Sequence, residues 1–382
     1  MYLHLFRPRI AASFPASAPA PVTEEGRRES SARPPIPLDR ATNWLRRRLG
    51  RAVLLSYAAA LLLPGPGLWL RRPHTVLPAG PAHLTLRTAS FLLSLVLFSA
   101  GLQVPLRGLG RVLRYPKALL AGLTLHLALP LLIMPFVALL LRRTSDTDGG
   151  SGLLTAMILV VAMPVAAGAT VWTTKGDGDQ PTMVGLVLAS TLLSPLTTPL
   201  LLTALAPLLS GGYAHTLTDT GRSVDSGFTL ATVVLPCAAG LLCPFVLPPA
   251  RRDGLLRAVM PLAMAGSLLL TYVNASGALG SFLARPRPLL FAAALAVAAL
   301  VCLLSFALGR TAAWVLRLDA SAASSLTLAC GMSNSSASAV LITTSLPDKP
   351  HLLLPVLAYG LLQKTAASRV VTRLRPASPT VP

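Results

Sequence analysis

Long apolar segments alternate with short polar connections along the chain after about residue 50. Each segment is close to the roughly 20 residues that a helix needs to cross the hydrocarbon core of a bilayer. The pattern therefore predicts an all-α, polytopic membrane protein with about ten transmembrane helices. The expected spans are 52–70, 87–105, 117–141, 153–174, 183–209, 228–248, 255–283, 288–316, 324–345 and 352–372.

Two of these segments carry small and polar residues where a lipid-facing helix would be apolar. Residues 326–344 read LTLACGMSNSSASAVLITT, and residues 163–179 read MPVAAGATVWTTKGDGD. Such backbone persists at membrane depth only where protein shelters it or where it lines a wet cavity. A pair of interrupted segments in corresponding halves of a chain is typical of a secondary transporter's binding site. We therefore expect the chain to lose helical hydrogen bonding near 163–174 and 328–336, and these two stretches to cross.

The composition agrees with a membrane protein. Hydrophobic residues make up 53% of the 382 residues and charged residues only 12%, whereas soluble domains are nearer to about 25% charged. The formal net charge of +20 does not indicate nucleic-acid binding, because the basic residues lie in tails and short loops between apolar spans, as they do in membrane proteins generally.

The chain divides into a long apolar domain and two polar tails. Residues 1–50 are rich in Pro, Ala, Ser and Arg and have no apolar period, so they are predicted to form a disordered cytoplasmic tail. The transporter domain is expected at 51–375, and a short C-terminal tail at 376–382. An even number of spans places both ends on one side of the cell membrane. The basic residues of both tails predict that this side is the cytoplasm.

Four segments, in order along the chain, resemble the bile acid:sodium symporter family. They are YPKALLAGLTLHLALPLLIMP at 115–135 (the third span), residues 163–202 (a broken fourth span, a turn and the fifth span), CGMSNSSASAVL at 330–341 (a broken ninth span) and PVLAYGLLQKTAAS at 355–368 (the tenth span). The resemblance covers roughly 52–375.

The resemblance implies ten helices in two inverted five-helix repeats, at about 52–209 and 228–372, with a panel domain and a core domain. It also implies that broken helices cross near the membrane midplane. The implied activity is transport of a small organic anion, which the family commonly couples to sodium.

The positions that hold sodium in the family differ in this chain. The ninth-span Glu and Gln of the family fall on Ala329 and Ser333, the fourth-span Ser-Asn pair falls on Ala169 and Thr170, and the third-span Gln falls on His126. A hard cation prefers oxygen ligands and usually a negative charge, yet all thirteen carboxylates lie in the tail or in loops. We therefore expect weak sodium binding, and we expect no cofactor.

Two ionisable side chains lie at membrane depth, His126 in the third expected span and Lys364 in the tenth. Ionisable groups are costly there and are candidates for function. Under the resemblance, Gln363 and Lys364 stand at the family's tenth-span His-Asn pair. Two other interpretations stay open: an earlier end of the last span would place Lys364 at the inner interface, and His126 would be a neutral core histidine that donates to a backbone carbonyl.

These arguments give a set of candidate residues for binding substrate or ion: Thr170, Ser333, Asn334, Ser335, His126, Gln363 and Lys364. Half-helix N-termini at the crossing would favour an anion. A positive side chain could replace sodium, either protonated Lys364 paired with the substrate's carboxylate or His126 gaining a proton when substrate enters. Binding would then be linked to proton uptake, and facilitated transport without coupling is the other possibility.

Other classes of membrane protein fit the sequence less well. An intramembrane enzyme is not expected, because there is no HExxH motif and no intramembrane Asp pair. An arsenite-type or other metabolite exporter of the same superfamily is an alternative, but arsenite exporters use a fourth-span Cys that is absent here. A non-transporting receptor is a second alternative, and it would not need two broken spans.

Overall fold

The computed structural model describes residues 48–79, 82–104, 110, 117–142, 150–223, 230–284 and 286–374. The predicted tails at 1–50 and 376–382 lie outside these residues, except for 48–50. The described chain is helical apart from one antiparallel hairpin, in which β1 (His74–Ala79) pairs with β2 (Ala82–Leu86). The sequence analysis did not predict this hairpin.

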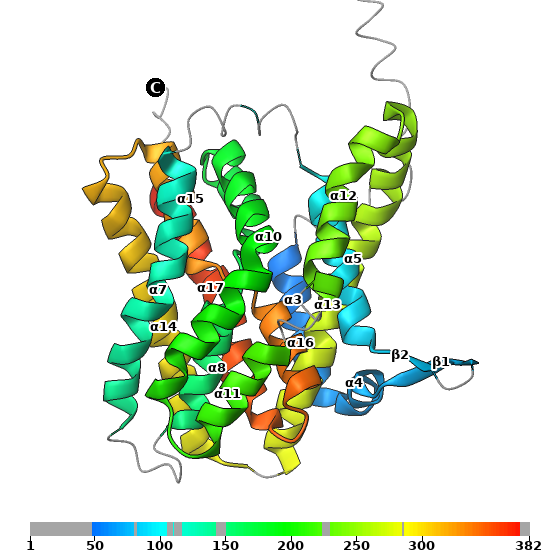
Figure 1. Cartoon of the computed structure of the whole chain (residues 1–382), viewed down its shortest axis with the longest axis vertical. Coiled ribbons are helices and arrows are strands. Elements are labelled where there is room, and N and C mark those ends of the chain that lie inside the picture. The colour runs from blue at the N-terminus through cyan, green and yellow to red at the C-terminus, as the bar shows by residue number, and fades with distance from the viewer. Residues whose placement is uncertain are drawn as a thin grey trace, which may run out of the picture.

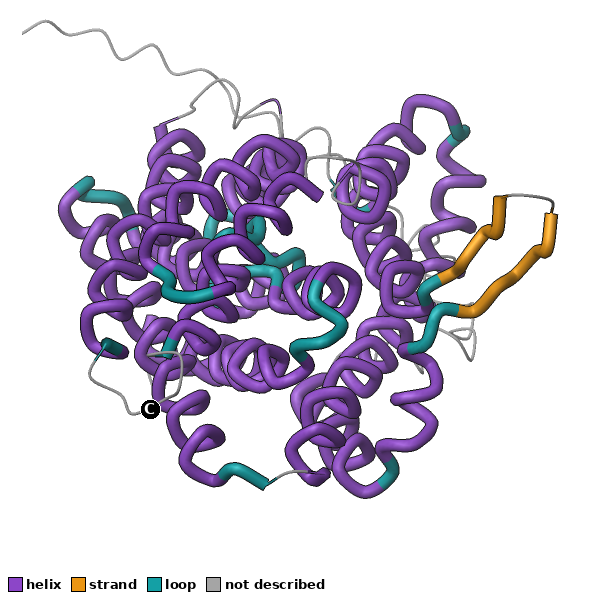
Figure 2. The backbone as a smooth tube through the Cα atoms, turned by 60° about the horizontal axis from the view of Figure 1, so that its bottom comes forward, coloured by secondary structure: helices purple, strands orange, loops and turns teal. Residues whose placement is uncertain are grey.

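The 14 α-helices of the described residues form two groups that lie side by side in Figures 1 and 2. The small helix group consists of α3 (Leu49–Leu62), α4 (Pro64–Arg71), α5 (Thr88–Leu102), α12 (Leu235–Val246) and α13 (Pro249–Ala284). The large helix group consists of α7 (Lys117–Leu141), α8 (Ser151–Val161), α9 (Ala169–Lys175), α10 (Gln180–Leu205), α11 (Gly212–Ser223), α14 (Pro288–Val315), α15 (Ala320–Gly331), α16 (Ser335–Ser345) and α17 (Leu353–Leu374). Three single turns complete the fold: a 3-10 turn at Ala206–Leu208, a π turn at Leu230–Val234 that leads into α12, and a 3-10 turn at Pro350–Leu352.

Fewer helices than the ten expected spans are long and apolar enough to cross a membrane. Among the described residues, α7, α10 with its 3-10 extension, α13 and α14 qualify, and α3 with α4 makes a fifth if this pair, bent by 93°, is one span. The difference has two causes: the expected spans 52–70, 153–174 and 324–345 each fold as two helices, and the expected spans 87–105 and 228–248 fold as helices of fewer than 18 residues, Thr88–Leu102 and Leu230–Val246. The last helix, α17, has 22 residues but carries Lys364 and Arg369, which lower its hydropathy.

Burial separates helices that face the surrounding membrane from those inside the protein. α7 exposes Leu131, Leu132 and Phe136 on its outer face, as expected where lipid is the solvent. In contrast, every residue of α8 is buried, and so is the end of α15 from Ser324 to Gly331. The short, interrupted helices therefore lie where neighbouring helices shelter their backbone, which is the condition for irregular backbone at membrane depth.

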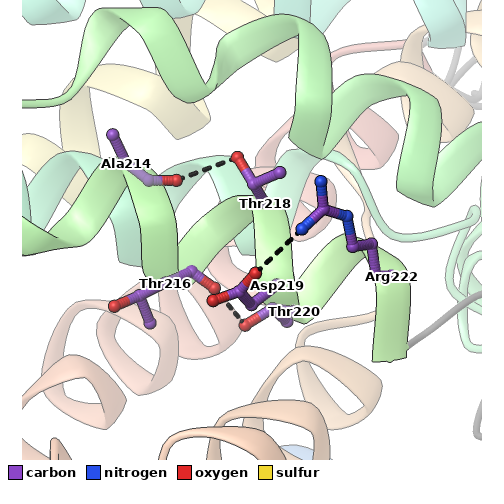
Figure 3. Close-up of polar contacts among 6 residues, drawn as sticks. All are labelled: Ala214, Thr216, Thr218, Asp219, Thr220 and Arg222. Atoms are coloured by element: carbon purple, nitrogen blue, oxygen red, sulfur yellow. Dashed lines mark hydrogen bonds and ion pairs between the residues drawn. The ribbon is translucent and has the colours of Figure 1, made fainter.

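The connection after α10 is itself helical, although the sequence pattern predicts only a polar link between the spans at 183–209 and 228–248. Figure 3 shows the polar contacts of α11, in which Thr218 and Thr220 donate to the carbonyls of Ala214 and Thr216, and Arg222 pairs with Asp219 at 3.3 Å. This ion pair is exposed and adds little stability. Lys349, in the connection between α16 and α17, contacts α11. Its Nζ donates to Thr216 Oγ1 at 3.3 Å and lies 4.3 Å from the centre of the Tyr213 ring. α11 thereby holds the connection between α16 and α17.

Candidate functional site

The two interrupted helices of the large group meet at their interruptions. The first break covers 162–168, between α8 and α9, and the second covers 332–334, between α15 and α16. The two stretches pair through an isolated antiparallel bridge between Val165 and Ser333, a hydrogen bond from Ala166 N to Met332 O (2.8 Å) and one from Asn334 N to Pro164 O (2.9 Å). We call these paired stretches the crossing. The pairing satisfies polar backbone groups that helical hydrogen bonds no longer satisfy.

Local sequence explains where each break falls. Pro164 has no amide hydrogen and disfavours helical backbone at the residue before it, so α8 ends shortly before this proline. Gly331 ends α15 in close contact with α14, because a Cβ at this position would lie 2.4 Å from the ring of Phe306. Asn334 then starts α16, since its Oδ1 accepts from Ala337 N at 3.1 Å as an N-cap.

Buried hydroxyl groups hold the backbone of the first break. Ser190 of α10 accepts from Val165 N at 3.1 Å. Thr198, two turns further along α10, donates to the carbonyl of Ala162 at 3.0 Å. Ser338 of α16 donates to the carbonyl of Leu159 near the end of α8 at 3.0 Å. The crossing is therefore fixed from two neighbouring helices as well as by its own pairing.

Tyr359 of α17 holds the second break in the same way. Its side chain is fully buried, and its hydroxyl donates to the carbonyl of Gly331 at 3.1 Å. The same hydroxyl also takes part in hydrogen bonds with the side chains of Ser333 and Ser305. α17 thus contacts the last residue of α15 and the middle residue of the break.

Five of the seven predicted site residues form a cluster at the crossing: four lie in it or bond directly to it, and Gln363 reaches it through Ser335. Ser333 and Asn334 form part of its backbone. Ser335, the first residue of α16, accepts from Gln363 Nε2 at 3.3 Å. Gln363 is only 3% exposed, and its Oε1 has no hydrogen-bond partner among the described residues. His126 is buried in α7 and hydrogen-bonds to the backbone of Met163, at the start of the first break.

The other two predicted residues bond to none of these five, although Thr170 bonds to Ala167 at the end of the first break. The prediction that the chain is unwound through residue 174 is wrong, because α9 begins at Ala169, and Thr170 is therefore helical. The Thr170 hydroxyl donates to the carbonyl of Ala167 at 2.8 Å, and its own carbonyl accepts from Gln180 Nε2 at 3.0 Å. Lys364 is half-buried and forms no hydrogen bond or ion pair with any part of the chain that the structure describes.

Sequence reasoning did not select Tyr359, Ser190 or Ser338. A hydroxyl in an apolar span is ambiguous, because it can bond to its own helix or to another element. Both outcomes occur on α10: Thr191 donates to the carbonyl of Val187 four residues earlier, whereas Thr198 donates to the first break. No motif in the sequence separates these two cases.

The chemistry of the crossing does not favour a bare cation. Two of the carboxylates that lie close in sequence to the half-helices serve as N-caps, Asp179 for α10 and Asp319 for α15. Asp179 stands 11 residues before Ser190 in the chain, a helical rise of about 16 Å. The described residues also contain no group of three or more His, Cys, Asp or Glu side chains that could hold a metal ion. The oxygen atoms that could bind a cation at the crossing therefore belong to hydroxyl, amide and carbonyl groups, none of which carries a negative charge.

A comparison with protein families assigns the chain to a family. The model of the sodium bile acid symporter family matches residues 90–285, just over half of the chain. The chain belongs to this family. Its members are secondary transporters rather than enzymes, and together with the apolar, membrane-length helices this makes the chain a multi-pass membrane protein. The match contains the first break of the crossing and ends before the second. No curated protein was found to match the chain.

Proposed function

We propose that this family member moves a small organic anion across the cell membrane by alternating access around the crossing. The observation that carries the proposal is the start of α16, which lies at the crossing beside the buried and only half-satisfied amide of Gln363. A helix N-terminus presents unpaired N–H groups and a partial positive charge, and both favour an anion.

Donors for an anion are available at this point. Asn334 caps Ala337 N, but the amide of Ser336 in the same first turn donates no hydrogen bond among the described residues. Gln363 can turn its amide so that Oε1 accepts from the Ser335 hydroxyl and Nε2 faces a ligand, because the two ends of an amide are nearly equal in shape. A carboxylate or sulfonate could then accept from both α16 and α17.

The fold suits alternating access with both chain ends in the cytoplasm. In our proposal the chain crosses the membrane ten times, in two inverted repeats at about 52–209 and 228–372. Each repeat contributes one interrupted helix pair, α8 with α9 and α15 with α16. The small helix group would move relative to the large group, so that the crossing faces each side of the membrane in turn.

A protein cation is proposed to take the place of sodium. The crossing supplies no negative charge to hold sodium, whereas Lys364 follows Gln363 directly and has no carboxylate partner among the described residues. Protonated Lys364 would pair with the anion's carboxylate, and His126, bonded to Met163, is a second group that could take up a proton on binding. Substrate binding would then be linked to proton uptake.

Binding to purified protein tests the proposal. A screen of carboxylates and sulfonates by calorimetry, with and without sodium and at several pH values, should find an anion that binds without sodium and more tightly at lower pH. Lys364→Met should weaken this binding, and Arg369→Met, an exposed cation one turn later on α17, is the matched control. Failure of every anion to bind would contradict the proposed substrate class. Binding that requires sodium and ignores pH would contradict the proposed coupling alone.

A further inference from the structure

Two hydrogen bonds join the small helix group to the large one near the same end of the molecule. Arg87, directly before α5, donates from Nη1 to the carbonyl of Thr343 at 3.3 Å. Tyr57 of α3 donates from its hydroxyl to the carbonyl of Leu357 at 3.2 Å. The two acceptors stand on either side of the connection 346–352 between α16 and α17, so both bonds close the interface beside this connection.

The contact of Arg87 uses the chemistry of a helix end. Thr343 lies in the last turn of α16, where carbonyl groups have no partner within the helix and carry a partial negative charge. A guanidinium satisfies such a carbonyl and is favoured electrostatically at this position. This bond exists only while the start of α5 lies against the end of α16.

Tyr57 lies between this closed end and the candidate site. A Cβ on Gly360 would be 2.8 Å from Ser335 Oγ and 3.9 Å from the Tyr57 hydroxyl, so α3, α16 and α17 meet closely around this glycine. Ser335 in turn bonds to Gln363. The Tyr57 hydroxyl is therefore a group of the small helix group that reaches the immediate neighbourhood of the crossing.

We propose that Arg87 and Tyr57 form a latch that closes the extracytoplasmic side of the transport pathway. The latch rests on the proposed alternating access and on the orientation that places both chain ends in the cytoplasm and the connection 346–352 outside. Movement of the small group away from α16 and α17 breaks both bonds and opens the crossing to the outside. The strength of the two bonds therefore sets how much of the protein faces outward when no substrate is bound.

Labelling of a cysteine at the crossing tests the latch without any need for a substrate. The probe is Ser336→Cys in a background that lacks the four native cysteines, labelled by a membrane-impermeant maleimide added to the extracytoplasmic face of oriented vesicles. Loss of one hydrogen bond should raise the labelling rate roughly three- to ten-fold in Arg87→Met and in Tyr57→Phe. The matched controls are Arg72→Met, an exposed arginine near the same end, and Tyr272→Phe, whose hydroxyl bonds within the small group; both should leave the rate unchanged.

The outcomes separate the latch from the proposed substrate. Unchanged labelling in both latch variants, or a rise only from the cytoplasmic face, would overturn the latch. A rise from the extracytoplasmic face supports the latch even if no tested anion is transported, which would count against the substrate class alone. Arg87→Lys, which keeps the charge and one donor, should give an intermediate rate, and it provides the same test if Arg87→Met does not fold.

Discussion

Substitution of Asn334 separates the structural role of the crossing from its affinity for an anion. The side chain caps α16 through Ala337 N at 3.1 Å, while the bond from Asn334 N to Pro164 O belongs to the backbone and survives any substitution. Asn334→Ala should cost about 0.5–2 kcal/mol of stability, the usual effect of removing a cap. For a chain of this size this corresponds to a fall in Tm of about 0.6–2.5 °C. Asn334→Ser and Asn334→Asp keep a capping oxygen and should retain stability.

The affinity for the anion should rank these variants differently from their stability. Asn334→Asp adds a negative charge where the anion is proposed to bind. A repulsion of about 2 kcal/mol is modest for two charges a few ångströms apart in a protein. A repulsion of this size weakens binding roughly 30-fold. Asn334→Ser remains neutral and should bind nearly as well as the unmodified protein. Thermal unfolding in detergent and calorimetric titration of the same preparations measure both effects. Equal affinity of Asn334→Asp and Asn334→Ser, at equal stability, would refute the assignment of the anion to the start of α16.

Two further substitutions test the surroundings of the crossing. Ser190→Ala leaves Val165 N without its partner and should lower the free energy of unfolding by about 1–3 kcal/mol. The control Ser194→Ala loses only a bond within α10 and should lower it less. Equal losses of stability in thermal unfolding would count against the support that we assign to Ser190. His126→Gln, which restores the family residue, should remove the pH dependence of anion binding and leave binding itself intact, and calorimetry across pH that finds an unchanged pH profile would exclude His126 as the proton-linked group.

The interrupted segments are predictable because their composition conflicts with their surroundings. Small and polar residues inside an apolar segment, at 163–179 and 326–344, can only be accommodated where protein shelters them. The position of each break also follows from single residues, Pro164 in the first and the Asn334 cap in the second. The resemblance to the symporter family, drawn from four segments at 115–135, 163–202, 330–341 and 355–368, is confirmed by the family match over 90–285, which contains the first two of them.

Other features depend on contacts that a sequence does not express. The return of Thr170 to helical backbone depends on where α9 can restart after the break, and Gln180 Nε2 supports it from a neighbouring helix. Tyr359 reads as one more apolar residue until α17 packs against Gly331. A single span is expected for the first apolar segment, but the segment bends by 93° at Pro64. It bends because α4 packs on α13, so closely that a Cβ on Gly67 would meet the side chain of Ser276.

Uptake of the tightest-binding anion into proteoliposomes tests the central claim most directly. Vesicles that contain the unmodified protein should show saturable uptake that exceeds uptake by Asn334→Asp vesicles, without sodium and faster when the outside is made acidic. Equal uptake by these two preparations would contradict transport around the crossing. Uptake that rises steeply with sodium and ignores pH would mean that hydroxyls and carbonyls near Thr170, Ser333 and Asn334 suffice to bind sodium after all, and would refute the proposed replacement of sodium by a protein cation.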